Sequence, residues 1–261
     1  MNPDPNAAPR VPTERVLGIE FFSGTAAEAV EHLARHGGYA VIPAGPALMK
    51  LNYDEDYRRA MQSADLALAD SGLLALMWRI ATGRKLRNIS GITFLKQLLG
   101  SAEIRTDGAT LFVFASGEAK EKAAKWFRAR ETLVHERSYH VASSPPEVHD
   151  YALLSRIEEL RPRHVVMAIP GGTQEKLALY LREHLVYRPS IYCVGAALGF
   201  LSGSERPIPE WAEKSHLGWA ARLFAQPRMF FPRLAMSLGL ARMVFKYRSE
   251  LPPVRSHWAD A

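Results

Sequence analysis

Residues 163–181 have the sequence RHVVMAIPGGTQEKLALYL, and this stretch decides the fold. Val165 to Ile169 is an apolar run rich in β-branched residues, which is typical of a buried strand. Pro170-Gly171-Gly172 cannot continue a strand, and Thr173 can cap a helix over Glu175 to Leu181. The stretch therefore predicts a strand, a tight turn and a helix.

The turn at Gly171 and Gly172 is the first candidate for a binding site. Glycine lets a ligand approach the backbone closely, and free N–H groups at a helix start attract phosphate or another anion. An ordinary connection between a strand and a helix has the same kind of sequence. From this stretch alone, both interpretations stay open.

The rest of the chain repeats this alternation. We expect strands at residues 16–22, 39–42, 66–69, 110–115, 138–142, 165–169 and 190–194. We expect helices at residues 25–36, 54–63, 73–81, 92–99, 118–130, 146–160 and 175–181. Strands that alternate with helices of roughly 10 to 15 residues predict an α/β fold, in which a parallel sheet has helices on both faces.

The composition limits the class of protein. The 261 residues suffice for one large domain, or for one domain with an appendage, and 48% of them are hydrophobic. Lys and Arg outnumber Asp and Glu by 33 to 27, which gives a net charge of +6 and a pI near 9.5. This charge favours a polyanionic partner, such as a membrane surface, nucleic acid or a diphosphate ligand.

The setting of the protein is indicated by three features. Cys193 is the single cysteine, which excludes an internal disulfide and a metal site of several cysteines, and fits a reducing cytosol. The N-terminus up to Pro12 is polar and does not resemble a signal peptide. No apolar run reaches the roughly 20 residues that span a bilayer. We therefore expect a cytoplasmic protein whose membrane contact is peripheral.

The composition changes along the chain and predicts four parts. Residues 1–14 are rich in proline and short of apolar residues, which predicts a disordered tail. Residues 15–203 carry the alternation of strands and helices and form the core domain. Beyond Gly203 no strand is predicted, and we expect a helical, basic appendage over residues 204–250 and a C-terminal tail over residues 251–261.

The basic appendage predicts a membrane partner. Between Gly218 and Ser249 there are six cations and no acidic residue, and bulky apolar side chains lie between the cations. Such a helical segment suits the headgroup region of an anionic membrane. A helical hairpin that packs on its own domain or on a neighbouring subunit is the alternative. We expect no nucleic-acid partner, because the cations alternate with bulky aliphatic residues instead of forming a polar basic face.

Asp70 is the first candidate for chemistry. It ends a predicted buried strand, and ligands of open parallel sheets bind beyond the carboxyl ends of the strands. A carboxylate there could act as a general base. The alternative is structural, because Asp is a common N-cap and would satisfy N–H groups of the helix that starts at Gly72.

Metal binding has one weak candidate, Asp54-Glu55-Asp56, which has the Asp-x-Asp spacing of many metal-dependent nucleotide-sugar enzymes. These carboxylates open a charged helix, where the helix dipole favours them, so we expect a first turn and no metal. The histidines show no paired metal-ligand spacing, and neither a P-loop nor Gly-x-Ser-x-Gly is present.

Polar contacts for a ligand are offered by the residues after the glycine turn and by the appendage. Gln174 has both a donor and an acceptor for a sugar or uracil, and its alternative is a solvated first-turn residue. Arg206, Arg222 and Arg228 could clamp a diphosphate, although any one of them is more often a surface charge.

Several blocks of sequence together resemble one family. They are LALADSG at residues 66–72, NISGITF at 88–94, AIPGGTQE at 168–175, VGAALGFLSG at 194–203, and PEW, LGWAARL and QPR at 209–211, 217–223 and 226–228. Their order and spacing resemble the WecG/TagA/CpsF family of bacterial glycosyltransferases over roughly residues 16–233. The chain is similar to a divergent member.

The resemblance implies a Rossmann-like core and a C-terminal appendage that helps complete the site and attaches to the membrane. It implies an inverting, metal-independent transferase without a cofactor. Such an enzyme moves a sugar, here a hexose or an N-acetylhexosamine, from a UDP-sugar to a polyprenyl-diphosphate-linked sugar in surface or exopolysaccharide synthesis. The protein would lie on the inner face of the bacterial plasma membrane, and a homo-oligomer is left open.

The same resemblance assigns roles to residues. The catalytic base falls on Asp70, and the glutamine of the family motif falls on Gln174. We expect the donor to contact Gly171, Gly172, Gln174 and Gly195. We expect the phosphates or the acceptor to contact Arg87, Asn88, Arg206, Arg222 and Arg228.

The chain departs from the family pattern at several positions. The Thr-x-Asn of the family falls on Pro43-Ala44-Gly45, its Pro-Asp-Gly becomes Ala69-Asp70-Ser71, and its arginine three residues before Gly91 is Asn88. The glutamate of its Leu-Glu-Trp becomes Gly218. The first interpretation of these departures is that the protein acts on a different substrate. The alternative function is a non-catalytic nucleotide-sugar-binding or scaffold subunit of a polysaccharide assembly complex.

Overall fold

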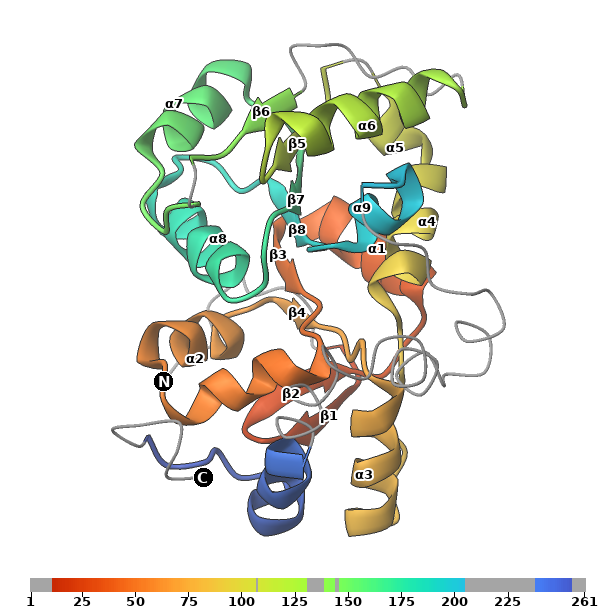
Figure 1. Cartoon of the computed structure of the whole chain (residues 1–261), viewed down its shortest axis with the longest axis vertical. Helices are drawn as coiled ribbons and strands as arrows, with labels where there is room; N and C mark the ends of the chain where they lie inside the picture. The colour runs from red at the N-terminus through yellow and green to blue at the C-terminus, as the bar shows by residue number, and fades with distance from the viewer. Residues whose placement is uncertain (1–10, 107, 131–138, 144–145, 205–237, 255–261) are drawn as a thin grey trace.

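The computed structural model describes residues 11–106, 108–130, 139–143, 146–204 and 238–254. Within these residues, eight strands form one sheet with the order β1-β2-β4-β3-β8-β7-β5-β6 (Figure 1). The strands are β1 (Thr13–Val16), β2 (Ile19–Phe22), β3 (Gly38–Val41), β4 (Leu66–Ala67), β5 (Thr110–Phe114), β6 (Tyr139–Val141), β7 (His164–Ala168) and β8 (Ser190–Cys193). β1 and β2 pair antiparallel, and every other neighbouring pair in this sheet is parallel. The predicted parallel sheet is confirmed.

The first hairpin differs from the prediction. One strand was expected over residues 16–22, but the chain turns back at Leu17 and Gly18, whose φ angles are 51° and 76°. These left-handed angles end a strand, and the following residue begins β2. β1 begins at Thr13, so the strand starts inside the segment for which a disordered tail was predicted.

Helices surround the sheet. They are α1 (Ala26–His36), the 3₁₀ helix η1 (Gly45–Asn52), α2 (Glu55–Gln62), α3 (Gly72–Thr82), α4 (Gly91–Gly100), α5 (Ala102–Arg105), α6 (Gly117–Arg128), α7 (Tyr151–Leu160), α8 (Thr173–His184) and α9 (Ala197–Ser202). Each predicted helix is present. α7 begins later than expected because Asp150 caps it, accepting a hydrogen bond from Leu153 N at 2.8 Å. The short helices η1, α5 and α9 were not predicted.

The helices cover both faces of the sheet, as predicted (Figure 1). On one face α1 packs on α4, and α9 packs on both α4 and α6. On the other face α2 packs on α8, and α7 contributes the buried Leu153 and Ile157 to the same core. The residues between sheet and helices form two hydrophobic clusters, one on each face. This is the doubly covered arrangement expected of a Rossmann-like α/β fold.

A further helix spans residues 238–247, within the predicted appendage. Its buried side chains Leu240, Met243 and Val244 belong to the core cluster that also includes α2 and α8. A backbone hydrogen bond of 2.7 Å from Leu17 N to Arg248 O ties the end of this helix to the β1–β2 turn. This part of the appendage is therefore helical and packs on the core. Residues 205–237 lie outside the described residues, and no helix in the described part of the chain could cross a bilayer.

A buried histidine in β7 makes the stability depend on pH. His164 is 1% exposed, and its Nδ1 lies 3.1 Å from the hydroxyl of Tyr192. Burial lowers the pKa of His164 to about 4, against the opposing effect of the Glu103 carboxylate. Between pH ~6.5 and pH 4, His164 is protonated in the unfolded chain but stays neutral in the folded chain. The free energy of unfolding is therefore unaffected by His164 above pH ~6.5 and decreases as the pH falls towards 4.

We expect this loss to be roughly 3 kcal/mol of unfolding free energy between pH 6.5 and pH 4. Urea unfolding at several pH values measures it. A His164→Asn variant should lose most of this slope, while His184→Asn, at an exposed position of α8, should keep it. An unchanged slope in His164→Asn would contradict the assignment.

Candidate functional site

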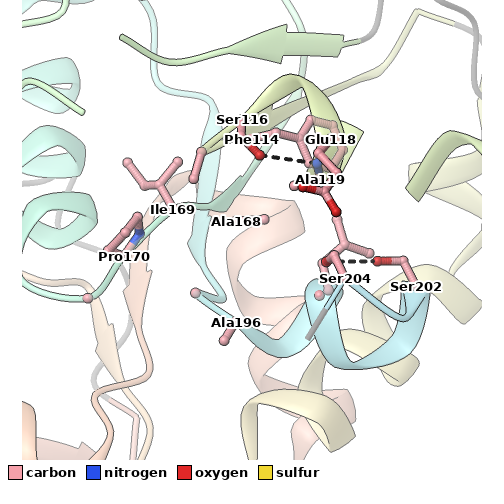
Figure 2. A pocket seen from close by; sticks show the side chains of 15 residues that line it. Phe114, Ser116, Glu118, Ala119, Ala168, Ile169, Pro170, Ala196, Ser202 and Ser204 are labelled. Atoms are coloured by element: carbon pink, nitrogen blue, oxygen red, sulfur yellow. Dashed lines mark hydrogen bonds between the residues drawn. The ribbon is translucent and has the colours of Figure 1, made fainter. Parts of the chain in front are cut away.

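A pocket of about 380 Å³ lies at the carboxyl ends of β5, β7 and β8 (Figure 2). Its walls come from the start of α6, from the β7–α8 turn at Pro170 and Gly171, and from the β8–α9 loop at Gly195 and Ala196. Figure 2 shows Ser116 and Glu118, at the start of α6, opposite Ser202 and Ser204 at the end of α9. The pocket is therefore built mainly of backbone and small side chains, with a carboxylate and hydroxyl groups at its rim.

The order of the strands explains why the pocket forms there. β5 and β8 lead into α6 and α9, which pack together on one face of the sheet. β7 lies in the sheet between β5 and β8, but it leads into α8 on the opposite face. Loops that leave neighbouring strands in opposite directions open a crevice, and ligands of such sheets bind in it. The size is within the range of small-molecule sites.

The β7–α8 turn is held from inside by Glu175. Gly172, not Thr173 as predicted, is the N-cap residue of α8. The Glu175 carboxylate is fully buried, accepts a hydrogen bond from Gly172 N at 2.5 Å, and also accepts one from the Gln174 amide at 3.2 Å. Burial raises the pKa of Glu175, while these hydrogen bonds and the ammonium of Lys50 act in the opposite direction. The turn is therefore rigidly held.

Gly172 must be a glycine in this turn. Its φ angle is +96°, and a Cβ at this position would lie 1.9 Å from Lys50 Nζ. The N–H of Gly172 is used by Glu175, and Gln174 N donates to Pro170 O at 3.3 Å. These two helix-start groups are thus engaged within the protein. The anion cradle considered for this turn is at most a partial one.

Gln174 lies under the pocket and is not the solvated residue of the alternative interpretation. Its side chain is 2% exposed, and its Oε1 accepts a hydrogen bond from Gly195 N at 2.9 Å. Its Nε2 donates to Glu175 and, at 3.5 Å, to Cys193 O. Gln174 therefore joins the β7–α8 turn to the β8–α9 loop, two walls of the pocket. Gly171 and Gly195 line the pocket itself.

Asp70 follows β4 and lies at the start of α4. Its Oδ1 accepts a hydrogen bond from Gly91 N at 3.0 Å. The N-cap of α3 is the neighbouring Ser71, whose Oγ accepts from Leu74 N at 3.1 Å. The alternative role, in which Asp70 caps the helix that starts at Gly72, is therefore wrong.

Asp70 also lies beside the β8–α9 loop. A Cβ placed on Gly91 would lie 3.7 Å from Asp70 Oδ2, 3.5 Å from the Ala197 Cβ and 3.8 Å from the Val194 carbonyl. Two groups at 3.7 and 3.8 Å from one point are at most 7.5 Å apart, so Asp70 Oδ2 lies no farther than this from the Val194 carbonyl. Val194 and Ala197 flank Gly195 and Ala196, which line the pocket. One loop therefore approaches Asp70 and the pocket together.

Of the residues predicted to contact the phosphates or the acceptor, Arg87 and Asn88 do not line the described pocket. Asn88 pairs with Ala69 in an isolated parallel bridge, next to Asp70 in sequence. Arg87 is exposed. The pKa of the Glu28 carboxyl is lowered mainly by its hydrogen bonds with Thr25 and, to a smaller extent, by the charge of Arg87. Arg206, Arg222 and Arg228 lie outside the described residues.

Position 45 has little room for a side chain while Ser71 keeps its present position. Gly45 is buried at the start of η1, and a Cβ on it would lie 2.9 Å from Ser71 Oγ. The same Cβ would lie 3.5 Å from Leu240 of the helix over residues 238–247. Ser71 thus takes the space that a side chain at position 45 would need.

Asp54 has the structural role that was favoured for it. It caps α2, accepting a hydrogen bond from Tyr57 N at 2.9 Å, and its other oxygen pairs with Lys176 Nζ at 3.0 Å. Among the described residues, no group of three or more His, Cys, Asp or Glu side chains is arranged to hold a metal ion.

Glu118 is the charged residue of the pocket lining, and it was not predicted from the sequence. Its carboxylate pairs with Lys122 Nζ one helical turn later, at 2.8 Å. The hydrogen bond and the charge of Lys122 lower the pKa of Glu118, so the carboxylate is ionised at neutral pH. The one signal in the sequence was its place in the first turn after β5, a strand end in the sheet.

Sequence comparisons agree with this architecture. Residues 14–253 match the profile of the family described as "Glycosyl transferase WecG/TagA/CpsF family". Over 224 residues the chain is 23% identical to the N-acetylglucosaminyldiphosphoundecaprenol N-acetyl-beta-D-mannosaminyltransferase of Bacillus subtilis (strain 168), covering 82% of this chain and 84% of that protein. Because the family profile extends over nearly the whole chain, this protein belongs to the WecG/TagA/CpsF family of glycosyl transferases.

Proposed function

We propose that this glycosyltransferase moves a sugar from a UDP-sugar to a polyprenyl-diphosphate-linked sugar, with inversion and without a metal ion. The family assignment and the name of the Bacillus subtilis relative support the substrate classes. The observation that carries the proposal is that the β8–α9 loop lines the pocket with Gly195 and Ala196 and approaches Asp70 with Val194 and Ala197.

In this proposal the pocket holds the donor. The carboxyl ends of β5, β7 and β8 are the usual ligand edge of such a sheet, and Gly171 and Gly195 let the nucleotide approach the backbone. Gln174 supports the donor site indirectly by holding Gly195 in place.

Glu118 sets the orientation of the donor. An ionised carboxylate repels the diphosphate but accepts hydrogen bonds from hydroxyl groups. Glu118 therefore contacts the ribose or the transferred sugar, both of which have neighbouring hydroxyl groups. This places hydroxyl-bearing parts of the donor towards Glu118 and the charged part towards the backbone of the pocket.

Asp70 acts as the general base. It removes the proton from the acceptor hydroxyl, whose oxygen attacks the anomeric carbon while the bond from that carbon to the UDP oxygen breaks. One displacement inverts the anomeric configuration. Gly91 N holds Oδ1 of the carboxylate, so the base is oriented before the acceptor arrives. The arginines Arg206, Arg222 and Arg228 are proposed to neutralise the diphosphates together with Arg87, and Asn88 is proposed to contact the phosphates or the acceptor.

Metal independence is supported by the contacts that Asp54 makes within the protein. The Asp-x-Asp spacing at residues 54–56 is the motif that could hold a divalent ion, and the Asp54 oxygens already bind Tyr57 N and Lys176. Charge neutralisation then comes from cationic side chains. The acceptor is a membrane lipid, so we propose a peripheral position on the cytoplasmic face, in surface or exopolysaccharide synthesis.

The function is tested by turnover. Purified protein is given a panel of UDP-sugars and a polyprenyl-diphosphate-linked N-acetylglucosamine, with and without EDTA, and the products are analysed by mass spectrometry and NMR. We expect one donor to be used, EDTA to change kcat less than about twofold, and the anomeric configuration to be inverted. Loss of turnover in EDTA, restored by Mg²⁺, contradicts metal independence.

The alternative, a non-catalytic binding or scaffold subunit, gives a different result in the same assay. UDP would bind in calorimetry, but no donor on the panel would be transferred or hydrolysed. The loss of polar side chains at Pro43 and Gly45 motivates this alternative. The surroundings of Gly45 oppose it, since the Ser71 hydroxyl lies where a side chain at position 45 would begin, so this space is occupied.

Glu118→Gln is expected to raise the KM for the donor about tenfold, with a smaller effect on kcat, because a ligand hydroxyl loses a charged acceptor. Steady-state kinetics with varied donor measure this. The matched control is Glu121→Gln on the same helix, which removes an exposed carboxylate near Lys120 away from the pocket lining. Equal KM values for the two variants would show that Glu118 does not contact the donor.

A further inference from the structure

α3 has a second apolar face in addition to the one that packs in the core. Leu74, Met77 and Trp78 are buried, and Trp78 Nε1 donates to the buried Glu14 at 3.0 Å, which anchors the helix on β1. On the outward face Leu76 is 50% exposed and Ile80 is 66% exposed. Apolar side chains one helical turn apart on the outer face indicate a contact beyond the protein's own core.

The helix over residues 238–247 has the same organisation. Leu240, Met243 and Val244 are buried, whereas Leu238 is 66% exposed and Phe245 is 47% exposed. These two exposed side chains are separated by two helical turns and therefore lie on one face. This helix also presents large apolar side chains outward.

The two helices meet at one end of the molecule. A Cβ placed on Gly45 would lie 2.9 Å from Ser71 Oγ, the N-cap of α3, and 3.5 Å from the side chain of Leu240. Both helices also attach to the β1–β2 hairpin, α3 through Glu14 and the second helix through Leu17. In Figure 1 both lie at the lower end, away from α6 and α7.

Cations lie close in sequence to the exposed apolar side chains. Residues 72–88, which include α3 and the turn after it, contain no acidic residue and four cations, Arg79, Arg84, Lys85 and Arg87, of which Arg84 pairs with the buried Glu14 at 2.9 Å. Residues 238–249 contain Arg242, Lys246 and Arg248, again without an acidic residue. Exposed apolar residues interleaved with cations suit the interface of an anionic bilayer, where the apolar groups reach the acyl chains and the cations contact lipid phosphates.

We propose that α3 and the helix over residues 238–247 form one docking surface for an anionic bilayer. This docking surface consists of Leu76, Arg79 and Ile80 on α3, and of Leu238, Arg242 and Phe245 on the second helix. The core domain thus binds the membrane directly, and not only through the appendage. The inference rests on the proposed function in one respect, because a lipid-linked acceptor requires access to a bilayer.

The test is cosedimentation of the full chain with vesicles of phosphatidylcholine alone or mixed with phosphatidylglycerol. The wild type should bind the anionic vesicles at least about tenfold more tightly than the neutral ones. Leu76→Glu/Ile80→Glu should bind the anionic vesicles at least about tenfold more weakly than the wild type. The matched control, Tyr151→Glu/Val186→Glu, changes side chains that are 71% and 79% exposed elsewhere, and should bind as the wild type does.

Other occupants of the docking surface give distinct results. If residues 205–237 covered α3, Leu76→Glu/Ile80→Glu would lower the Tm much more than the control pair. If a second copy covered it, light scattering would show the wild type as a dimer and the variant as a monomer. Either result overturns the proposal, and so does equal vesicle binding by the variant and the wild type.

A second variant keeps the proposal testable if the first fails to fold. Arg79→Gln/Arg242→Gln changes two exposed cations of the docking surface, and it should weaken binding to anionic vesicles about tenfold or more without changing binding to neutral ones. Unchanged binding to anionic vesicles would count against the proposal. Turnover with a short-chain, water-soluble acceptor separates this inference from the proposed function. The docking variants should keep the wild-type kcat in this assay. An inactive wild type would refute the proposed function but would not affect the result of vesicle binding.

Discussion

Asp70→Asn is expected to lower kcat by a factor of about 10² to 10⁴, because the amide cannot accept the proton of the acceptor hydroxyl. Asn keeps an oxygen where Oδ1 accepts the hydrogen bond from Gly91 N, so the start of α4 should be preserved. The variant should therefore have nearly the wild-type Tm and nearly the wild-type affinity for UDP. The measurements are steady-state kinetics with donor and lipid-linked acceptor, calorimetry with UDP, and thermal unfolding.

The pH profile separates a base from a positioning residue. The wild-type kcat should fall at low pH as the base is protonated, and the residual rate of Asp70→Asn should lack this limb. Asp150→Asn is the matched control, since Asp150 also bonds a helix-start N–H, on α7. Wild-type turnover by Asp70→Asn would disprove the assignment of the base.

Glu175→Leu is expected to lower the free energy of unfolding by about 3 kcal/mol, because it leaves buried donors without acceptors. The Gly172 N–H and the Gln174 amide both lose the Glu175 carboxylate. Urea unfolding measures the change. Glu183→Leu on the same helix removes a partly exposed carboxylate paired with Arg59, and it should cost less than about 1 kcal/mol. Equal losses in the two variants would mean that the buried hydrogen bonds add no stability.

Glu175→Gln adds a test of pH dependence. Burial raises the pKa of Glu175, so its ionised form is disfavoured in the folded state and its stabilising effect declines as the pH rises through the folded-state pKa. Gln keeps one acceptor oxygen and does not titrate. The stability of Glu175→Gln relative to the wild type should therefore increase from pH 5 to pH 8, as urea unfolding at both pH values would show.

The sequence was most informative where local and tertiary preferences agree. β5 and β7 are apolar, β-branched runs that are buried throughout or nearly so, and α1 begins at the expected Thr25 with a capping box. The β1–β2 hairpin was missed because Leu17, an apolar residue, has a left-handed φ that no sequence pattern indicates. The short helix α9 was not predicted because no side chain caps its start, so the sequence lacks the usual signal of a helix N-terminus.

The site was harder to predict than the fold. The position of Asp70 at a strand end follows from the alternation of strands and helices, but its bond to Gly91 N joins residues 21 positions apart. Gln174 was recognised as polar, whereas its burial depends on β8, which lies across the turn. Glu118 belongs to an ordinary amphipathic helix, and only the packing of α6 on α9 places it at the pocket.

The closeness of the Ser71 hydroxyl to the place of a Cβ at position 45 has a consequence for how the family diverges. Because a Cβ at position 45 and the hydroxyl at position 71 would compete for one space, a side chain at position 45 requires the Ser71 hydroxyl to move or to be absent. A small residue at position 71 therefore favours a larger one at position 45. Among homologous sequences, a residue larger than glycine at position 45 should therefore coincide with glycine at position 71, so that these two sites covary over evolutionary time.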